Sequence, residues 1–186
     1  MTKKSQFAFG VATAALVAGL ATSANAACIV GGSTVTCTGN STAAEVNAAL
    51  ASVGDDDVTL EMTDAATVVQ PNGQIQPTQK GEVAINNGGD IGTDAAPVGV
   101  FYVGTSANTD NAFSLANSGS ISGPVSVSNV GGSTNILNSG LLAEGVFVSV
   151  QGPAALTNTG QIDSSGSLAI YLASRTSSDI VLDGDV

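Results

Sequence analysis

Leu115-Ala-Asn117-Ser-Gly119-Ser-Ile121 is the clearest copy of a short motif that recurs along this 186-residue sequence. The same pattern, apolar-x-Asn-x-Gly-x-apolar, recurs as Ile85-Asn-Asn87-Gly-Gly89-Asp-Ile91, Ile136-Leu-Asn138-Ser-Gly140-Leu-Leu142 and Leu156-Thr-Asn158-Thr-Gly160-Gln-Ile162. A degenerate copy, Val69-Gln-Pro71-Asn-Gly73-Gln-Ile75, precedes them with Pro in the Asn position. Successive asparagines are 30, 21 and 20 residues apart. Four copies with apolar residues in register indicate a repeat architecture.

Each copy of the motif is followed by a second apolar segment. These segments are 98–103, 125–128, 145–150 and 168–172. One period therefore holds a strand, a turn, a second strand and a polar connection, and we expect the longer first period to carry a loop around 95–111. A unit of this size cannot bury its own apolar residues, whereas stacked units share one core. We predict an all-β parallel β-helix, or solenoid. The rival, a β-sandwich, predicts irregular strand spacing without a repeated register.

The motif residues themselves suggest structural roles at the corner of each coil. Glycine supplies the positive φ that a sharp turn needs, and asparagine tolerates left-handed conformations and hydrogen-bonds the turn backbone. Stacked coils would place the asparagine amides in a ladder. The predicted structural repeat residues are Asn87, Gly89, Asn117, Gly119, Asn138, Gly140, Asn158 and Gly160.

The N-terminus has the three parts of a secretory signal peptide. A basic segment ends at Lys4, an uncharged apolar run extends from Phe7 to about Thr22, and the small residues of Ala24-Asn25-Ala26 suit a signal peptidase. The alternative is a membrane anchor, but the run is shorter and less apolar than the roughly 20 residues of a spanning helix. We therefore predict that residues 1–26 are removed and that the protein is exported, to the cell surface, the outer membrane or the extracellular medium.

The two cysteines of the chain, Cys28 and Cys37, flank a predicted hairpin whose turn is Gly31-Gly32-Ser33. They lie at similar distances from the turn, and export would take them to an oxidising compartment, so we expect a disulfide. A redox or metal-binding pair is disfavoured because the spacing is not C-x-x-C and the chain has no histidine.

A short helix is predicted next, over about 42–52. Thr42 followed by Glu45 fits a capping box, and Gly54 ends the helix. A strand is expected over 58–62. The predicted organisation is a signal peptide (1–26), an N-terminal cap (27–66) and β-helix repeats (67–186).

The acidic net charge of the chain disfavours anionic partners. After removal of residues 1–26, Lys80 and Arg175 are the basic residues that remain, against 15 acidic residues. Such a surface repels phosphate groups, so we expect no nucleic-acid binding and no binding to anionic lipid surfaces.

No catalytic constellation is predicted. Without histidine a Ser-His-Asp or Cys-His site is impossible. Acidic residues near expected corners, which are Asp90, Asp94, Glu144, Asp163 and Asp183, could in principle act in glycoside hydrolysis. The aspartates of 55–57 and Asp183-Gly184-Asp185 could bind Ca²⁺, although solvated turns are favoured. We accordingly predict no enzyme, no cofactor and no metal site.

The signal peptide, the hairpin Cys28-Ile-Val-Gly-Gly-Ser-Thr-Val-Thr-Cys37 and the Asn-x-Gly repeats together resemble the passenger region of bacterial autotransporters. The resemblance implies a right-handed parallel β-helix at the cell surface with a structural or adhesive role. Its expected partners are a ligand on a host or neighbouring cell and, at the C-terminus, an outer-membrane barrel. Residues 179–186 look like another coil instead, so we expect the sequence to be a fragment. A secreted carbohydrate-active β-helix, a glycoside hydrolase or lyase, is the alternative.

Overall fold

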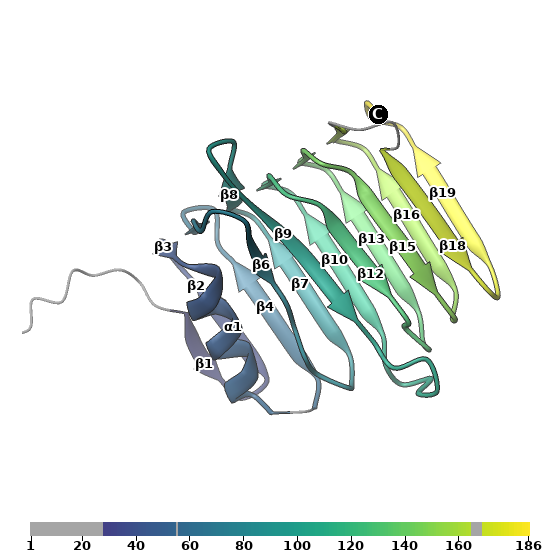
Figure 1. Ribbon diagram of the computed structural model, residues 1–186, viewed down its shortest axis with the longest axis horizontal. Coiled ribbons are helices and arrows are strands. Elements are labelled where there is room, and N and C mark those ends of the chain that lie inside the picture. The colour runs from purple at the N-terminus through teal and green to yellow at the C-terminus, as the bar shows by residue number, and fades with distance from the viewer. Residues whose placement is uncertain (1–27, 55, 165–168) are drawn as a thin grey trace, which may run out of the picture.

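The described part of the chain folds into a parallel β-solenoid of about six turns, as the repeats predicted, and contains one helix (Figure 1). The computed structural model describes residues 28–54, 56–164 and 169–186. The coils follow one another along the long axis of the molecule and wind in a right-handed sense. The predicted signal peptide lies outside the described residues. Among those residues, no helix is long and apolar enough to cross a membrane.

Three parallel sheets form the sides of the solenoid. Sheet A contains β2 (Thr34–Cys37), β4 (Val58–Met62), β7 (Val83–Asn87), β10 (Phe113–Asn117), β13 (Thr134–Asn138), β16 (Ala154–Asn158) and β19 (Ser178–Leu182). Sheet B contains the short strands β3 (Asn40–Ser41), β5 (Thr67–Val68), β8 (Asp90–Thr93), β11 (Ser120–Ile121), β14 (Leu141–Leu142) and β17 (Gln161–Ile162). Sheet C contains β6 (Gly73–Ile75), β9 (Ala96–Val103), β12 (Val125–Ser128), β15 (Val146–Val150) and β18 (Ile170–Ser174).

We number the coils by their sheet A strands. Coil 1 begins at β2, coil 2 at β4, coil 3 at β7, coil 4 at β10, coil 5 at β13 and coil 6 at β16, and β19 begins a seventh. The solenoid thus starts at β2, inside the region 27–66 that the sequence suggested as a separate cap. Cys37 and Met62 stand in coils 1 and 2 where later coils have asparagine, so the motif does not mark these two coils.

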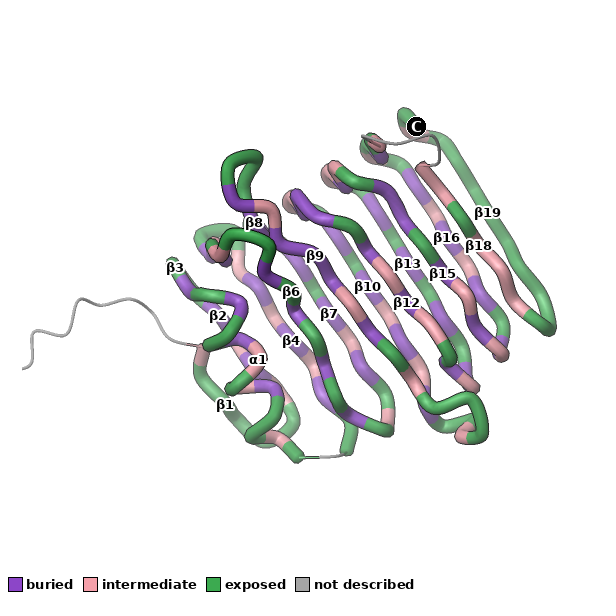
Figure 2. Tube along the Cα trace, viewed as in Figure 1, coloured by how far each residue is buried: buried purple, intermediate pink, exposed green. Residues whose placement is uncertain are grey.

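The core consists of columns of like side chains, one from each coil. Figure 2 shows buried residues alternating with more exposed ones along the strands, as the period of a β-strand requires. In sheet A one inward column contains Leu60, Ile85, Leu115, Ile136 and Leu156, all with at most 1% of their surface exposed. Each such side chain contributes about 1.5–3 kcal/mol by burial, so the columns are the main source of stability.

Helix α1 (Ala43–Ser52) closes the N-terminal end of the solenoid. It takes the place of a sheet C strand in coil 1 and lies beside β6 (Figure 1), burying Val46 and Leu50. The Asn47 amide donates to the Gln74 carbonyl (2.8 Å) and accepts from the Gln76 N–H (2.7 Å). These bonds satisfy backbone groups along the edge of β6 that would otherwise invite another strand.

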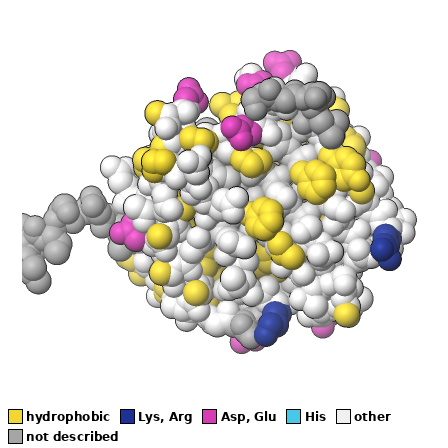
Figure 3. Space-filling model, viewed as in Figure 1, with side chains coloured by type: hydrophobic (Ala, Val, Ile, Leu, Met, Phe, Trp, Pro, Cys, Tyr) yellow, Lys and Arg dark blue, Asp and Glu magenta, His cyan; other side chains and the backbone are white. Residues whose placement is uncertain are grey.

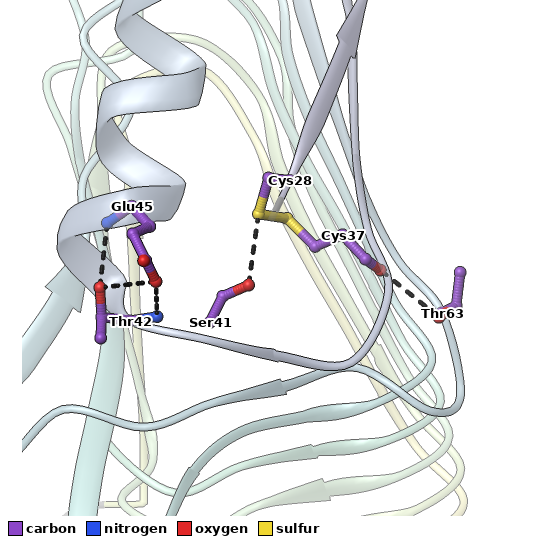
Figure 4. Close-up of a disulfide and its surroundings, with 6 residues drawn as sticks. All are labelled: Cys28, Cys37, Ser41, Thr42, Glu45 and Thr63. Carbon is purple, nitrogen blue, oxygen red and sulfur yellow. Dashed lines mark hydrogen bonds between the residues drawn. A yellow bond between two sulfur atoms is a disulfide. The ribbon is translucent and has the colours of Figure 1, made fainter. Parts of the chain in front are cut away.

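The start of the helix follows the predicted capping box (Figure 4). Thr42 is the N-cap, and its hydroxyl oxygen accepts from the Glu45 N–H at 3.2 Å. In return the Glu45 carboxylate accepts from the Thr42 N–H at 2.7 Å. The helix ends before Gly54, which has a φ of +96°.

The predicted hairpin and disulfide are also present. Strand β1 (Ile29–Gly31) pairs antiparallel with β2, and a disulfide joins Cys28 to Cys37 across the pair (Figure 4). Because β2 is the first parallel strand of sheet A, β1 covers the N-terminal edge of that sheet. The hairpin and α1 therefore cap adjacent sides of the same end.

The third coil is longer than the others, as expected, but its extra residues do not form the single loop that was expected around 95–111. Ile91 and Val100, nine residues apart, align with Ile121 and Val125, which are four apart. This insertion forms an antiparallel extension in which Gly92 pairs with Pro97. The remaining extra residues follow Val103. The single predicted loop is thus wrong, because β9 (Ala96–Val103) occupies the first half of that range and one insertion lies at each of its ends.

Candidate functional site

The four repeat asparagines form one buried column at the end of the sheet A strands. Asn87, Asn117, Asn138 and Asn158 are at most 2% exposed. Each of the first three donates from Nδ2 to Oδ1 of the next asparagine, at 2.7 Å in every case. The same Nδ2 atoms also bond carbonyl groups of the following corner, such as Leu141 O, 3.2 Å from Asn117. The column is therefore a structural ladder that joins successive coils.

The ladder ends where the residue type changes. Met62 precedes Asn87 and Leu182 follows Asn158 in the same column. Consequently Oδ1 of Asn87 is buried without a hydrogen-bond partner. Gly184 lies in the corner position of the repeat, so Asp183-Gly184-Asp185, considered above for Ca²⁺, is a further copy of the corner with Leu in place of Asn.

The repeat glycines have a different role from the predicted one. Gly89, Gly119, Gly140 and Gly160 are not among the residues with positive φ, and neither are the ladder asparagines. Instead, successive corners stack in close contact: a Cβ on Gly140 would lie 2.0 Å from the carbonyl oxygen of Gly119. The prediction that these glycines adopt positive φ was therefore wrong. Glycine is needed at these positions because the close approach of the neighbouring coil leaves no room for a Cβ.

An open groove of about 950 Å³ runs beside the ladder on the outside of the molecule. It follows the C-terminal ends of the sheet A strands from coil 2 to coil 6, which is four strand spacings, or about 19 Å. Its floor is one outward column: Glu61, Asn86, Ala116, Leu137 and Thr157. The groove therefore crosses the strands and suits an extended molecule.

Hydroxyl groups line one side of the groove. Thr63, Ser118, Ser139 and Thr159 occupy the corners of their coils. Each hydroxyl also contacts a carbonyl of the preceding coil; Ser139 Oγ, for example, donates to Asn117 O at 3.3 Å. These bonds fix the orientation of the hydroxyl groups on a rigid backbone. Leu137, 46% exposed, is the main apolar surface of the floor.

One end of the groove is closed by a longer corner in coil 2. Met62 and Thr67, five residues apart, align with Asn87 and Asp90, which are three apart. The Asp64 carboxylate lies over Gly88, where a Cβ would be only 2.6 Å from Asp64 Oδ1.

This closed end also carries the second carboxylate of the groove. Glu61 Oε1 accepts from Asn86 Nδ2 at 2.7 Å. Glu61 and Asp64 therefore make one end of the groove acidic, while the rest of its lining is neutral.

The carboxylates suggested by the sequence lie elsewhere. Asp90 and Asp94 belong to coil 3, Glu144 to coil 5, Asp163 to coil 6 and Asp183 to the corner after β19. None of them lines the groove. Asp90 instead accepts from Ser120 Oγ at 2.6 Å, and Asp163 accepts from Gln161 Nε2 at 3.0 Å. They are distributed surface groups of the solenoid.

The acidic run after α1 contacts the next coil through Asp57. Asp55 lies outside the described residues, and Asp57 Oδ1 accepts from the Glu82 N–H at 2.7 Å. Within the ranges 28–54, 56–164 and 169–186, no group of three or more Asp, Glu, Cys or His side chains could hold a metal ion.

A buried polar network lies at the opposite end of the strands. Tyr102 donates to the Gln79 carbonyl at 3.0 Å, and Asn111 Nδ2 donates to the Tyr102 oxygen and to Gly81 O. Gln79 Nε2 donates in turn to Leu50 O at 2.7 Å, at the end of α1. Burial raises the pKa of Tyr102, and the hydrogen bond with Asn111 partly offsets this rise.

The groove was not predicted from the sequence. Its floor is formed by outward-pointing residues, such as Ala116 and Leu137, that lie between the fixed residues of the motif. The residue type at this position differs from copy to copy. A signal was nevertheless present: once the copies are aligned on asparagine, the residue before each asparagine forms this column.

Comparison with protein-family models, with curated proteins and with solved structures finds no match to this chain.

Proposed function

We propose that the protein is an exported β-solenoid of the autotransporter-passenger type, with a structural or adhesive role at the bacterial cell surface. The groove of sheet A would be its contact surface. The observation that carries this proposal is the continuity of the groove across five coils, because a long, rigid and mostly neutral groove suits an extended polymer better than a small substrate.

Two further features support this proposal. The disulfide between Cys28 and Cys37 is of a kind that persists in oxidising compartments. The stacked coils also give a stiff, elongated body whose side surfaces are available along its whole length. The expected partner is a ligand on a host or neighbouring cell. If the chain is the N-terminal part of a longer protein, an outer-membrane barrel would hold it at the surface.

The experiment uses the full sequence, expressed with its own N-terminal segment in a Gram-negative host. Export predicts that the product recovered outside the cytoplasm begins at Ala27. Beads coated with this product are then incubated with cultured epithelial cells and, separately, with Gram-negative bacteria. We expect the coated beads to adhere to at least one of these two cell types.

A matched pair of variants locates the contact. Leu137 and Leu141 belong to the same coil and both point outward, Leu137 into the groove and Leu141 on sheet B. Leu137→Lys should reduce bead adhesion by at least about fivefold, as for loss of a central contact residue, and Leu141→Lys should not. Absence of adhesion to both cell types, or equal loss in the two variants, would contradict the proposal.

A carbohydrate-active enzyme is the second candidate, because Glu61 and Asp64 both line the closed end of the groove. Most glycoside hydrolases use a pair of catalytic carboxylates at one site. This candidate predicts release of reducing ends from a polysaccharide and its loss in Glu61→Gln. Adhesion without any such release favours the first proposal.

A further inference from the structure

A column of aromatic side chains lies on the outer face of sheet C, away from the groove. After residue 27 the chain has five aromatic residues. Tyr102 and Phe113 stack inside the solenoid. The other three, Phe101, Phe147 and Tyr171, share one outward register position, which Ser126 occupies in coil 4. We call Phe101, Ser126, Phe147 and Tyr171 the aromatic column.

The column lies on the face seen in Figure 3, where hydrophobic side chains gather over β15 and β18 and, separately, near β9, and its members Phe101 and Ser126 are partly buried. Phe147 is 44% exposed and Tyr171 is 40% exposed. Stacking contributes about 0.5–1.5 kcal/mol to such a pair, but it leaves much of both rings in contact with water. Exposed aromatic rings that gather on one rigid face are typical of a binding surface.

The geometry of the column leaves a gap beside Phe147. Phe147 and Tyr171 stack with ring centroids 4.6 Å apart and ring planes within 8° of parallel. The stack therefore runs along the solenoid axis, and the other face of Phe147 is directed toward coil 4. In coil 4 the small side chain of Ser126 occupies this position, and the backbones of Phe147 and Phe101 on either side of it are two strand spacings, about 9.5 Å, apart.

The size of this gap favours a puckered, saturated ring. A flat ring in contact at about 3.5–4 Å on both faces fills roughly 7–8 Å. The gap is somewhat wider, by about the thickness that a chair-form sugar ring adds. Ser126 contributes a hydroxyl group to the gap, and Ser128 and Ser149 contribute outward hydroxyl groups in the adjacent column. Hydroxyl groups beside an aromatic face match the polar edge and apolar face of a pyranose.

We propose that the gap at Ser126, between Phe101 and Phe147, binds a pyranose ring of a neutral glycan. The acidic charge of the chain, with 15 Asp and Glu against 4 Lys and Arg, disfavours anionic polysaccharides and anionic lipid surfaces. A protein partner is disfavoured because a stable interface buries about 1,200–2,000 Å², far more than three aromatic side chains provide.

Affinity electrophoresis tests this proposal. The exported full chain is run on native gels containing hydroxyethyl cellulose, glycogen or galactomannan, and on a gel containing polygalacturonate. We expect at least one neutral polysaccharide to retard the protein and the anionic polymer to leave its mobility unchanged.

Three substitutions locate the site. Phe147→Ser copies the residue that coil 4 already has at this position, and it should weaken retardation by at least about fivefold through loss of the aromatic contact. Ser126→Phe fills the gap and should abolish retardation, although it extends the aromatic stack and should leave the melting temperature equal or higher. Val103→Ser is the control, because Val103 is 47% exposed in the adjacent column and aligns with Ser128.

The outcomes separate the glycan site from a purely structural stack. A structural stack predicts no effect of Ser126→Phe on binding. Retardation of the wild type by none of the three neutral polymers, or equal retardation of wild type, Phe147→Ser and Ser126→Phe, overturns the proposal. Because Leu137 lies on sheet A, Leu137→Lys should not affect retardation, so failure of the groove proposal and failure of this one are distinguishable.

Discussion

At the scale of single residues, the corner of each coil depends on an asparagine and on the glycine two residues later. The asparagine links coils through its side-chain amide, and the glycine lets the backbones of successive corners approach. A buried amide must find its partners inside the protein. The amides of Asn117, Asn138 and Asn158 bond groups of their own coil and of the next one, whereas the Asn87 amide group donates to the next coil and its oxygen has no partner. The ladder therefore makes the register of the coils specific.

The ladder predicts unequal effects of the same substitution at two positions. Asn138→Ala removes the amide bonds to both Asn117 and Asn158. It should lower the free energy of unfolding by about 2–3 kcal/mol, since buried partners lose their bonds. Asn87→Ala removes one such bond and also an acceptor that has no partner, so it should cost clearly less. Urea unfolding followed by circular dichroism measures both, and equal losses would contradict the ladder as a source of stability.

The sequence was sufficient to place these residues but not to explain all of them. Recurrence of the motif predicted that Asn87, Asn117, Asn138 and Asn158 lie in one column, because register follows directly from the repeat. The reason for the glycines was missed. A contact of 2.0 Å between a Cβ on Gly140 and Gly119 O depends on how closely two coils stack, and a single sequence does not contain that distance.

At the scale of elements, local and non-local signals differ in what they predict. The capping box of α1 and the hairpin around Gly31-Gly32 are local, and both were predicted within one or two residues. The position of α1 beside β6 was not predicted, because it rests on bonds between Asn47 and residues almost 30 positions later. The groove has the same origin, since its closed end requires Asp64 to lie over Gly88 of the next coil.

The N-terminal cap yields a prediction about reducing conditions. The disulfide holds β1 over the edge of sheet A, and a loop of this size stabilises by about 2–3 kcal/mol. Addition of dithiothreitol should therefore lower the melting temperature of the wild type by several degrees. The double variant Cys28→Ala with Cys37→Ala should melt at the lower temperature with or without the reductant. A wild type that is insensitive to complete reduction, verified by thiol titration, would show that the hairpin is held by other contacts.

At the scale of the whole molecule, a solenoid is stabilised by contacts between neighbouring coils, and the Tyr102 network extends this coupling. Gln79 of coil 2 contacts the end of α1 in coil 1, while Tyr102 of coil 3 contacts Gln79. Asn111, in the connection to coil 4, completes the network. Coils 1 to 3 thus share one buried polar cluster, and a change in its protonation should act on the unfolding of the whole N-terminal half.

Tyr102 makes this coupling measurable at alkaline pH. Its pKa in the folded protein is raised above the ordinary value of 10.0 by burial. Below pH 10 the phenol is protonated in both states, and its contribution to stability is constant. Above pH 10 the unfolded chain loses the proton first, so the free energy of unfolding should fall as pH rises, by up to about 1.4 kcal/mol per pH unit, until the folded-state pKa is passed.

Tyr102→Phe should separate the two contributions of this side chain. At pH 8 the variant should be less stable by about 1–2 kcal/mol, because the bond to Gln79 O is lost and Asn111 loses an acceptor. Between pH 10 and 11 its stability should fall less steeply than that of the wild type, so the two curves converge. Tyr171→Phe, which removes an exposed phenol from sheet C, controls for general alkaline effects. Parallel curves for wild type and Tyr102→Phe would mean that ionisation of Tyr102 is not coupled to unfolding, and that the buried network does not act on the solenoid as one unit.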